Sequence, residues 1–206
     1  MSAPRYFYRP EDGHGLKHDP FNSIIAPRPI GWVSTKNASG QVNLAPYSFF
    51  NAFNYRPPII GFSSIGYKDT VKNAQQSGEF CWNLVSRSQV EAMNETSAMV
   101  SSDTDEFDLA GLSKCESTII KAPHVAGCPV VMECKTTQIV QLQSVRGEKV
   151  ETWLVLGEVV GVHIVEALIE DGVYQTTRAE PVMRGGGPAD YFGITEANRF
   201  QLSRPS

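Results

Sequence analysis

The sequence predicts a mainly β protein whose strands form one closed antiparallel barrel. Six or seven segments alternate between apolar and polar side chains or are rich in β-branched and aromatic residues, as strands are. Only two helical patterns occur, both short, and there is no regular succession of strand, helix and strand. A doubly wound parallel sheet needs that succession, so the barrel is favoured.

The composition is that of an ordinary globular protein. Of 206 residues, 41% are hydrophobic and 19% charged, and the formal net charge is −4. This balance argues against nucleic acid or an anionic membrane as a partner. No apolar run could span a membrane and no signal peptide is recognised, so a cytoplasmic location is expected. The four cysteines lack C-x-x-C spacing, which argues against structural zinc and for reduced thiols.

Residues 1–26 are expected to form an extended arm, and residues 27–206 a single domain. The arm contains Arg-Pro, Asp-Gly and Asp-Pro pairs, which are turn signals. It also carries more aromatic residues than a solvated tail needs, so we expect these to pack on the domain or on a second subunit. They are Tyr6, Phe7, Tyr8 and Phe21.

The chain is organised around residues 27–51, which predict two strands joined by a polar turn. The first strand covers residues 30–35 and the turn residues 36–40. The second strand runs into residues 45–51, where Pro46 cannot donate a hydrogen bond to a neighbouring strand. This segment is therefore expected at a sheet edge or bulge, with backbone amides left over for another partner.

Residues 59–85 predict a strand, a helix and another strand. The strands cover residues 59–63 and 79–85. The helix covers residues 69–78, with Asp69 as its N-cap and Gly78 as its stop.

The second half of the chain is predicted to be largely β. Ser88-Gln89-Val90-Glu91 predicts a capping box that opens a helix to about residue 96. An exposed acidic loop over residues 97–108 follows. Strands are expected at residues 117–121, 130–142 and 152–166, the last two as a hairpin with a charged tip.

A candidate anion site surrounds the start of the helix near Asp69. Ser63, Ser64, Lys68 and Thr70 would add hydroxyl and ammonium donors to exposed backbone amides and the helix dipole. The alternative is that Asp69 and Thr70 only cap the helix and Lys68 is solvated.

The segment at residues 45–51 is a candidate site for a flat heterocycle. Its amides and the Ser48 hydroxyl could bond the ligand edge, while Trp32, Tyr47 or Phe49 packs near its face. The alternative is a core strand whose aromatic residues fill the barrel.

His163 is a candidate proton donor or contact for a hydride donor. Strand alternation places Val159, Gly161 and His163 on one face. The alternative is a structural histidine with satisfied hydrogen bonds.

Familiar catalytic motifs are missing from the sequence. G-x-S-x-G, H-E-x-x-H, the Walker loop and a dinucleotide fingerprint after a strand do not occur. Any chemistry is therefore expected to belong to a bound cofactor.

The motifs of the chain resemble those of the flavin reductase-like, FMN-binding split-barrel family, in its flavoprotein-oxygenase-associated subgroup. The matching strings run in family order from about residue 14 to the end. The main ones are Ala26-Pro27-Arg28-Pro29-Ile30-Gly31-Trp32-Val33-Ser34-Thr35, Asn43-Leu44-Ala45-Pro46-Tyr47-Ser48-Phe49-Phe50-Asn51, Lys68-Asp69-Thr70, Met93-Asn94-Glu95-Thr96-Ser97-Ala98 and Gly157-Glu158-Val159-Val160.

The resemblance implies a six-stranded split barrel that dimerises, with FMN, or FAD as an alternative, near the subunit interface. It places the isoalloxazine against the first strand and the segment at residues 43–51, and the phosphate near the helix start. His163 and Tyr191 are carried over as residues near the flavin. The implied cofactor residues are Trp32, Ser34, Thr35, Ala45, Pro46, Tyr47, Ser48, Phe49, Asn51, Ser63, Ser64, Lys68, Asp69, Thr70 and Tyr191.

The function that the resemblance implies is NAD(P)H-dependent reduction of flavin by hydride transfer to flavin N5. A separate flavin-dependent monooxygenase or an electron-acceptor protein would be the partner. The alternative is a tight-FMN electron carrier or flavin-binding module without NAD(P)H turnover. An oxidase resembling pyridoxamine-phosphate oxidase is less favoured, because the strings above belong to the reductase-like branch. Gly187-Pro188-Ala189 lengthens the glycine-rich turn relative to the family pattern, which leaves one pocket wall undefined.

Overall fold

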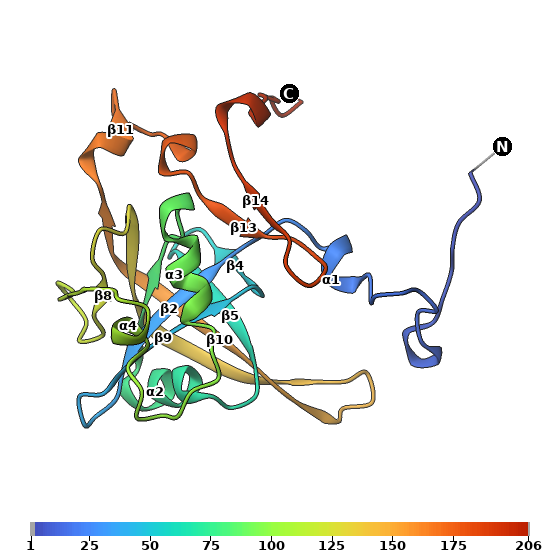
Figure 1. Cartoon of the computed structure of the whole chain (residues 1–206), viewed down its shortest axis with the longest axis horizontal. Helices are drawn as coiled ribbons and strands as arrows, with labels where there is room; N and C mark the ends of the chain where they lie inside the picture. Colours follow the sequence, from blue (N-terminus) through green and yellow to red (C-terminus); the bar gives the residue numbers. More distant parts are fainter. Residues whose placement is uncertain (1–2, 206) are drawn as a thin grey trace.

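One seven-stranded antiparallel sheet organises the computed structural model, which describes residues 3–205 (Figure 1). The sheet is curled, and its two edge strands, β3 and β4, are neighbours in the sequence. At the corner between them the carbonyl of Phe49 accepts from the amide of Ser63 at 2.8 Å. The strand order is β3 (Val42–Tyr47), β2 (Gly31–Lys36), β6 (Glu79–Asn83), β9 (Val130–Gln143), β10 (Lys149–Ile164), β5 (Ile59–Ile65) and β4 (Phe50–Asn54).

The predicted class, a mainly β antiparallel split barrel, is confirmed, with seven strands in place of six. The barrel is not closed as the alternation pattern predicted, because β3 and β4 do not pair with each other among the described residues. The difference arises because residues 42–54 are divided at Ser48 and Phe49 into β3 and β4. Pro46 lies in β3 opposite Trp32, with no strand on its other side. The predicted edge position of this proline is therefore correct.

Two apolar clusters lie on the two faces of the curled sheet. The interior cluster includes Phe62, Phe80 and Val155 and is closed by α2 (Asp69–Ser77). The outer cluster includes Trp32 and lies under α3 (Val90–Glu95) and α4 (Glu106–Leu109). Neighbouring residues of β2 therefore enter different clusters, and the strand is covered on both faces.

Short elements complete the described chain. A small sheet joins β1 (Arg28–Pro29), β13 (Val182–Arg184) and β14 (Tyr191–Gly193), while β7 (Lys114–Cys115) pairs with β8 (His124–Val125) and β11 (Ile169–Glu170) with β12 (Val173–Tyr174). The remaining helical pieces are α1 (Phe21–Ile24) and 3-10 turns at Pro10–Asp12, Arg87–Gln89, Glu166–Leu168, Thr176–Ala179 and Glu196–Asn198. Within residues 3–205, none of the helices has the length and apolar character to cross a membrane.

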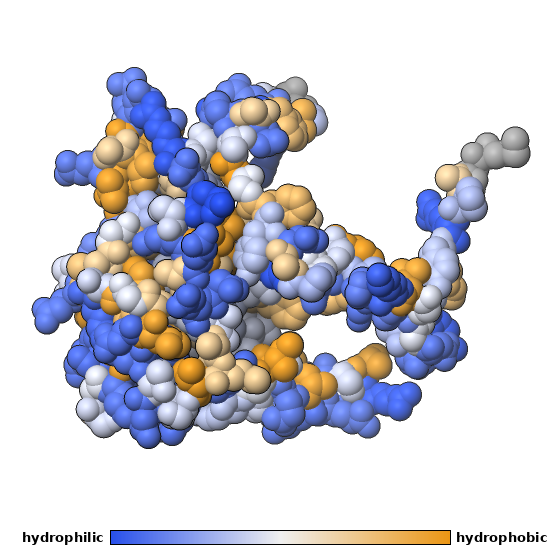
Figure 2. Space-filling view, in the orientation of Figure 1, coloured by the Kyte–Doolittle hydropathy of each residue, from blue (hydrophilic) through white to orange (hydrophobic). Residues whose placement is uncertain are grey.

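The described part of the N-terminal arm extends away from the barrel (Figures 1 and 2). It contains only the turn at Pro10–Asp12 and the single helical turn α1. Tyr6 and Phe7 are 67% and 83% exposed, so they do not pack on their own domain. Packing on a second subunit stays a prediction, and residues 1–2 lie outside the described part.

Three local expectations were wrong. Lys68, in an extended conformation, is the N-cap of α2, and Asp69 is already helical. The helix after Ser86 begins as a 3-10 turn, and neither that turn nor α3 has a side-chain cap, so the predicted capping box is not formed. Residues 97–108 include the helix α4, whose start is capped by the Asp105 carboxylate.

The first of the three strands predicted after residue 108 is also wrong, since residues 117–121 form an irregular loop. Their amides do not face a strand. Those of Thr118, Ile119 and Ile120 donate instead to the carboxylate of Glu133 on β9, at 2.6–2.9 Å. The two long strands, in contrast, match their predicted spans within three residues.

Gly157→Ala is expected to destabilise the barrel. A Cβ at this position of β10 would lie 2.4 Å from Cε1 of Phe80 and 3.2 Å from Cβ of Cys134, and both neighbours are fully buried. Overpacking of this kind costs about 1–3 kcal/mol, measured as a lower midpoint of urea unfolding. Gly193→Ala is the control, because its Cβ would meet nothing within 4 Å. Equal midpoints of urea unfolding for the two variants would contradict this packing.

Candidate functional site

A hollow of about 480 Å³ opens where the end of the N-terminal arm crosses the sheet. One wall is α1 and β1 with the Ala26-Pro27 link, and the other is formed by β4, β5 and β10. The walls are largely apolar, with a few polar groups among them, as ligand sites commonly are. The lining residues are Ile24, Ile25, Ala26, Pro27, Arg28, Pro29, Phe49, Phe50, Asn51, Phe53, Ser63 and Leu154.

The aromatic wall of the hollow is held by packing behind it. The ring of Phe50 stacks on Trp82, with centroids 5.5 Å apart and planes 8° from parallel. Trp82 is fixed in turn by a 3.0 Å bond from its indole nitrogen to the carbonyl of Ile30. A Cβ at Gly31 would lie 2.9 Å from the Phe50 ring, so only glycine allows this approach. The wall is therefore a preformed flat surface.

The start of α2 forms a second half-site. The amides of the first turn of a helix have no intrahelical partner, and the N-cap residue Lys68 gives them no side-chain hydrogen bond. Such amides, with the helix dipole, favour an anion. Lys68 itself is exposed. Strand β5 links the half-sites, because its Ser63 lines the hollow and its chain continues to Lys68.

The hydroxyls predicted around this anion site divide between two environments. Ser63 lines the hollow, whereas Ser64 and Thr70 are buried. Ser64 donates to the carbonyl of Gly66 at 2.9 Å, and Thr70 donates to Oδ1 of Asn43 at 2.6 Å. Both hydroxyls are therefore already engaged, that of Ser64 in the turn before the helix and that of Thr70 with strand β3.

Tyr47 carries a buried hydroxyl without a hydrogen-bond partner among the described residues. Its ring packs on Phe62, with centroids 4.6 Å apart. Burial raises the pKa of the hydroxyl, while the nearby Thr70 and Ser64 act in the opposite direction. The interior face of the anion half-site thus holds an unsatisfied donor.

The first-strand residues expected at the flavin lie inside the protein. Trp32 donates from Nε1 to Oγ1 of Thr96 at 3.0 Å, and Ser34 donates to the carbonyl of Pro123 at 2.5 Å. Thr35 accepts from the amide of Asn73 at 3.1 Å. The structure brings none of the three to the hollow.

The segment at residues 45–51 is only partly at the hollow. Phe49 and Asn51 line it. Ala45 and Pro46 are half-buried on the edge strand β3. Ser48 contributes its carbonyl, which accepts from Nε of Arg28 at 3.0 Å.

His163 lies in a different cluster, on the end of β10 remote from Leu154. Its Nε2 is 2.6 Å from the carboxylate of Glu133, whose side chain is fully buried. Its ring stacks on His124, with centroids 5.4 Å apart. The expected shared face is wrong for Val159, because the register shifts between Val159 and Gly161. Within one chain, His163 does not reach the hollow.

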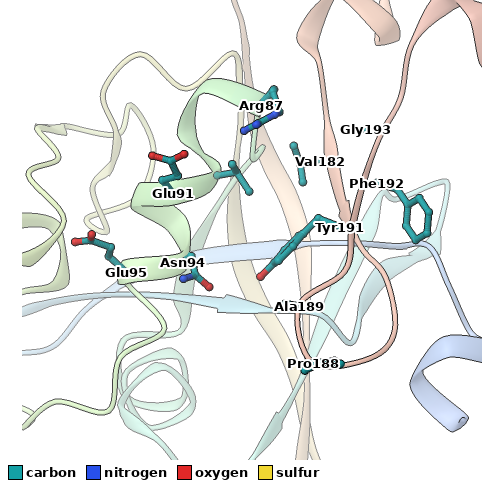
Figure 3. Close-up of a pocket in the computed structure, with 11 residues that line it drawn as sticks. Arg87, Glu91, Asn94, Glu95, Val182, Pro188, Ala189, Tyr191, Phe192 and Gly193 are labelled. Atoms are coloured by element: carbon teal, nitrogen blue, oxygen red, sulfur yellow. The ribbon is translucent and has the colours of Figure 1, made fainter. Parts of the chain in front are cut away.

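Tyr191 lines another hollow, of about 880 Å³, between α3 and β14 (Figure 3). Its ring lies under the guanidinium of Arg184, 4.9 Å from ring centroid to Cζ. Glu91, Asn94 and Glu95 line the opposite side on α3 (Figure 3). The structure therefore separates Tyr191 from the hollow that Phe49 and Ser63 line.

Sequence reasoning missed several wall residues of the first hollow, including Arg28, Phe53 and Leu154. The Pro-Arg-Pro string of residues 27–29 matches the family motif, but the motif alone gives Arg28 no role. An arginine between two prolines at the entry to a buried strand is a usable signal, since charged residues are rarely buried without a partner.

Comparisons with known proteins identify the family and the architecture of the chain. The model of the flavin reductase like domain matches residues 24–183. A protein of Halalkalibacterium halodurans is 34% identical over 189 residues, covering 88% of each chain. The crystal structure of nitrilotriacetate monooxygenase component B from Bacillus cereus has a TM-score of 0.82 at 32% identity, covering 98% of both chains.

Two further solved structures share the architecture. The 2-nitrobenzoate 2-nitroreductase of Pseudomonas fluorescens has a TM-score of 0.78 at 29% identity, covering 90% of this chain and 88% of that one. The flavoredoxin of Desulfovibrio vulgaris has a TM-score of 0.76 at 20% identity, covering 91% of this chain and 97% of the other, a likeness of fold alone.

The fold is that of a split barrel, and the family match with the likeness to a monooxygenase component B supports a flavin-binding oxidoreductase. The chain belongs to the family of the flavin reductase like domain, as the match over most of its length shows. The family expected from the sequence motifs is thereby confirmed.

Proposed function

We propose that the protein binds FMN across the two half-sites and catalyses its reduction by NAD(P)H. The observation that carries the proposal is the pairing of a flat aromatic wall at Phe49 and Phe50 with the uncapped start of α2. The first suits an isoalloxazine ring, and the second suits a phosphate. FAD is the alternative flavin.

The residues present fit FMN. A hollow of about 480 Å³ accommodates a tricyclic ring and part of its side chain. Asn51 and Ser63 offer polar groups beside that ring, and Lys68 with the first helical amides offers donors to the phosphate. The buried Tyr47 hydroxyl is a further donor without a partner.

Bound FMN would supply the acceptor for a hydride from NAD(P)H. The chain's own part would be to bind and orient. The Phe50–Trp82 stack gives a rigid wall, and the apolar residues Ile25 and Leu154 would pack beside the bound ring. Tyr191 and His163 would reach a flavin only in a second subunit's site, which the proposed homodimer would supply.

The proposed partner is a flavin-dependent monooxygenase or an electron-acceptor protein in the cytoplasm. The likeness to a monooxygenase component B supports the first choice. The alternative reading, a carrier that keeps FMN without NAD(P)H turnover, is an outcome of the test below.

The test is steady-state oxidation of NADH and NADPH with FMN, FAD and riboflavin, together with the absorbance spectrum of the purified protein. We expect NAD(P)H oxidation that depends on added or bound flavin. Protein that stays yellow through gel filtration but oxidises neither nucleotide would be a carrier, and the reductase proposal would be wrong. Protein that binds no flavin would overturn both.

A further inference from the structure

Arg28 ties together three segments around the hollow. Its Nε donates to the carbonyl of Ser48 at 3.0 Å, and its Nη2 donates to that of Gly185 at 3.1 Å. Its Nη1 donates to the carbonyls of Asn22 and Ile25. The N-terminal arm, the β3–β4 corner and the glycine-rich turn therefore meet at one guanidinium.

The charge of this guanidinium is not neutralised within the described chain. All four acceptors are neutral carbonyls, and no carboxylate of residues 3–205 forms an ion pair with Arg28. Arg28 is 8% exposed, and its register partner across the β1–β13 pair is another cation, Arg184. Burial and Arg184 both lower the pKa of Arg28, yet an arginine stays protonated in proteins.

A buried, unpaired cation is unusual, because burying a charge is costly unless it is paired. Arg28 lines the hollow, and its Cζ lies 5.6 Å from the ring centroid of Phe49, on the aromatic wall. An anion that forms in the hollow would lie close to this charge and be attracted to it.

We propose that Arg28 is the residue that favours the reduced state of the bound flavin. The oxidised ring is neutral and the two-electron-reduced ring is an anion when it has taken up one proton, so a fixed cation binds the second more tightly. This inference rests on the proposed function. Arg28 acts as an electrostatic and positioning residue, with no covalent part in the reaction.

The first test uses the unmodified protein, in which the midpoint potential of bound FMN is followed between pH 6 and 8. Uptake of one proton with two electrons gives a slope of about 30 mV per pH unit, and uptake of two protons gives about 59 mV, since each tenfold change in proton concentration is worth about 29.6 mV per proton. We expect the smaller slope down to pH 6. The larger slope would overturn the proposal.

The second test separates charge from scaffolding with two variants. Arg28→Lys keeps the positive charge but loses the planar set of guanidinium donors. Arg28→Gln keeps an amide donor but loses the charge. We expect Arg28→Gln to weaken the binding of reduced FMN about tenfold more than that of oxidised FMN. This difference corresponds to a fall of about 30 mV in the midpoint potential of bound FMN. Arg28→Lys should change the ratio of the dissociation constants of reduced and oxidised FMN less than threefold.

Arg184→Met is the matched control. Arg184 also donates to carbonyls of the glycine-rich turn, those of Gly187 and Asp190, but does not line the hollow. Its ratio should also change less than threefold. If Arg28→Lys and Arg28→Gln each weaken the binding of oxidised and reduced FMN equally, Arg28 only holds the three segments together and the inference is wrong. FMN that binds and turns over without these effects refutes the inference alone, whereas protein that binds no FMN refutes the proposed function.

Discussion

Glu133→Ala is expected to lower the free energy of unfolding by about 3–5 kcal/mol, as the removal of one partner from a buried charged network does. The side chain of Glu133 is fully buried and accepts from His163 and from the amides of Thr118, Ile119 and Ile120. Without the carboxylate, three backbone donors and an imidazole lose their partner. Urea unfolding followed by circular dichroism measures the loss.

The same network predicts how stability depends on pH. Burial raises the pKa of the Glu133 carboxyl, but the bonds from His163 and the three amides outweigh it and lower the pKa to about 2. A carboxyl with a depressed pKa stabilises the folded state above its unfolded pKa, and that contribution is lost as pH falls through the folded value. The unmodified protein should therefore lose stability between about pH 4.5 and pH 2.

Glu133→Gln is the control for this acid dependence, because it nearly preserves shape and cannot titrate. It should be less stable than the unmodified protein at pH 7, and the difference should shrink toward pH 2. His163→Ala should cost less than Glu133→Ala, since the amide bonds remain. A constant difference between Glu133→Gln and the unmodified protein across this pH range would contradict the assignment.

The Glu133 network also marks where sequence reasoning stopped. Strands β9 and β10 were predicted within three residues, because long alternation is a local signal. The loop at residues 117–121 has strand-like composition, but its amides are taken by a carboxylate from β9, a long-range contact with no local signal. The hydrogen bond of His163 to Glu133 is likewise a long-range contact, and the sequence pattern does not indicate it.

The candidate site was predictable in part for a related reason. Asn51, Phe49 and Ser63 were predicted and line the hollow. Trp32 and Ser34 were predicted on the same grounds but are buried, because β2 is covered on both faces and alternation cannot distinguish a ligand face from a core face. The hollow also needs the turn at Gly185 and the arm at Ile25, which only the folded chain brings together.

Lys68→Glu is expected to weaken FMN by about 2 kcal/mol, roughly 30-fold, and to leave riboflavin nearly unaffected. The change replaces a cation by an anion at the N-cap of α2, where the proposed phosphate would lie. Riboflavin lacks the phosphate and does not meet the new charge. Fluorescence titration of both flavins measures the two dissociation constants.

The fold should tolerate this substitution, because a carboxylate near a helix N-terminus is favourable and Lys68 is exposed. The melting temperature without flavin should be unchanged or slightly raised. Lys72→Glu is the matched control, since it makes the same change in charge on an exposed position of α2 within the next turn. An equal loss of FMN and riboflavin, or an equal effect of the two variants, would refute the phosphate position.

The kinetics of Lys68→Glu separate anchoring from chemistry. A phosphate contact is made equally before and during hydride transfer, so its loss should raise KM for FMN and leave kcat unchanged at saturating flavin. The ring would still rest on Phe50, which Trp82 supports from behind. A fall in kcat would instead mean that the start of α2 sets the position of the ring, through the short stretch of β5 that joins it to Ser63.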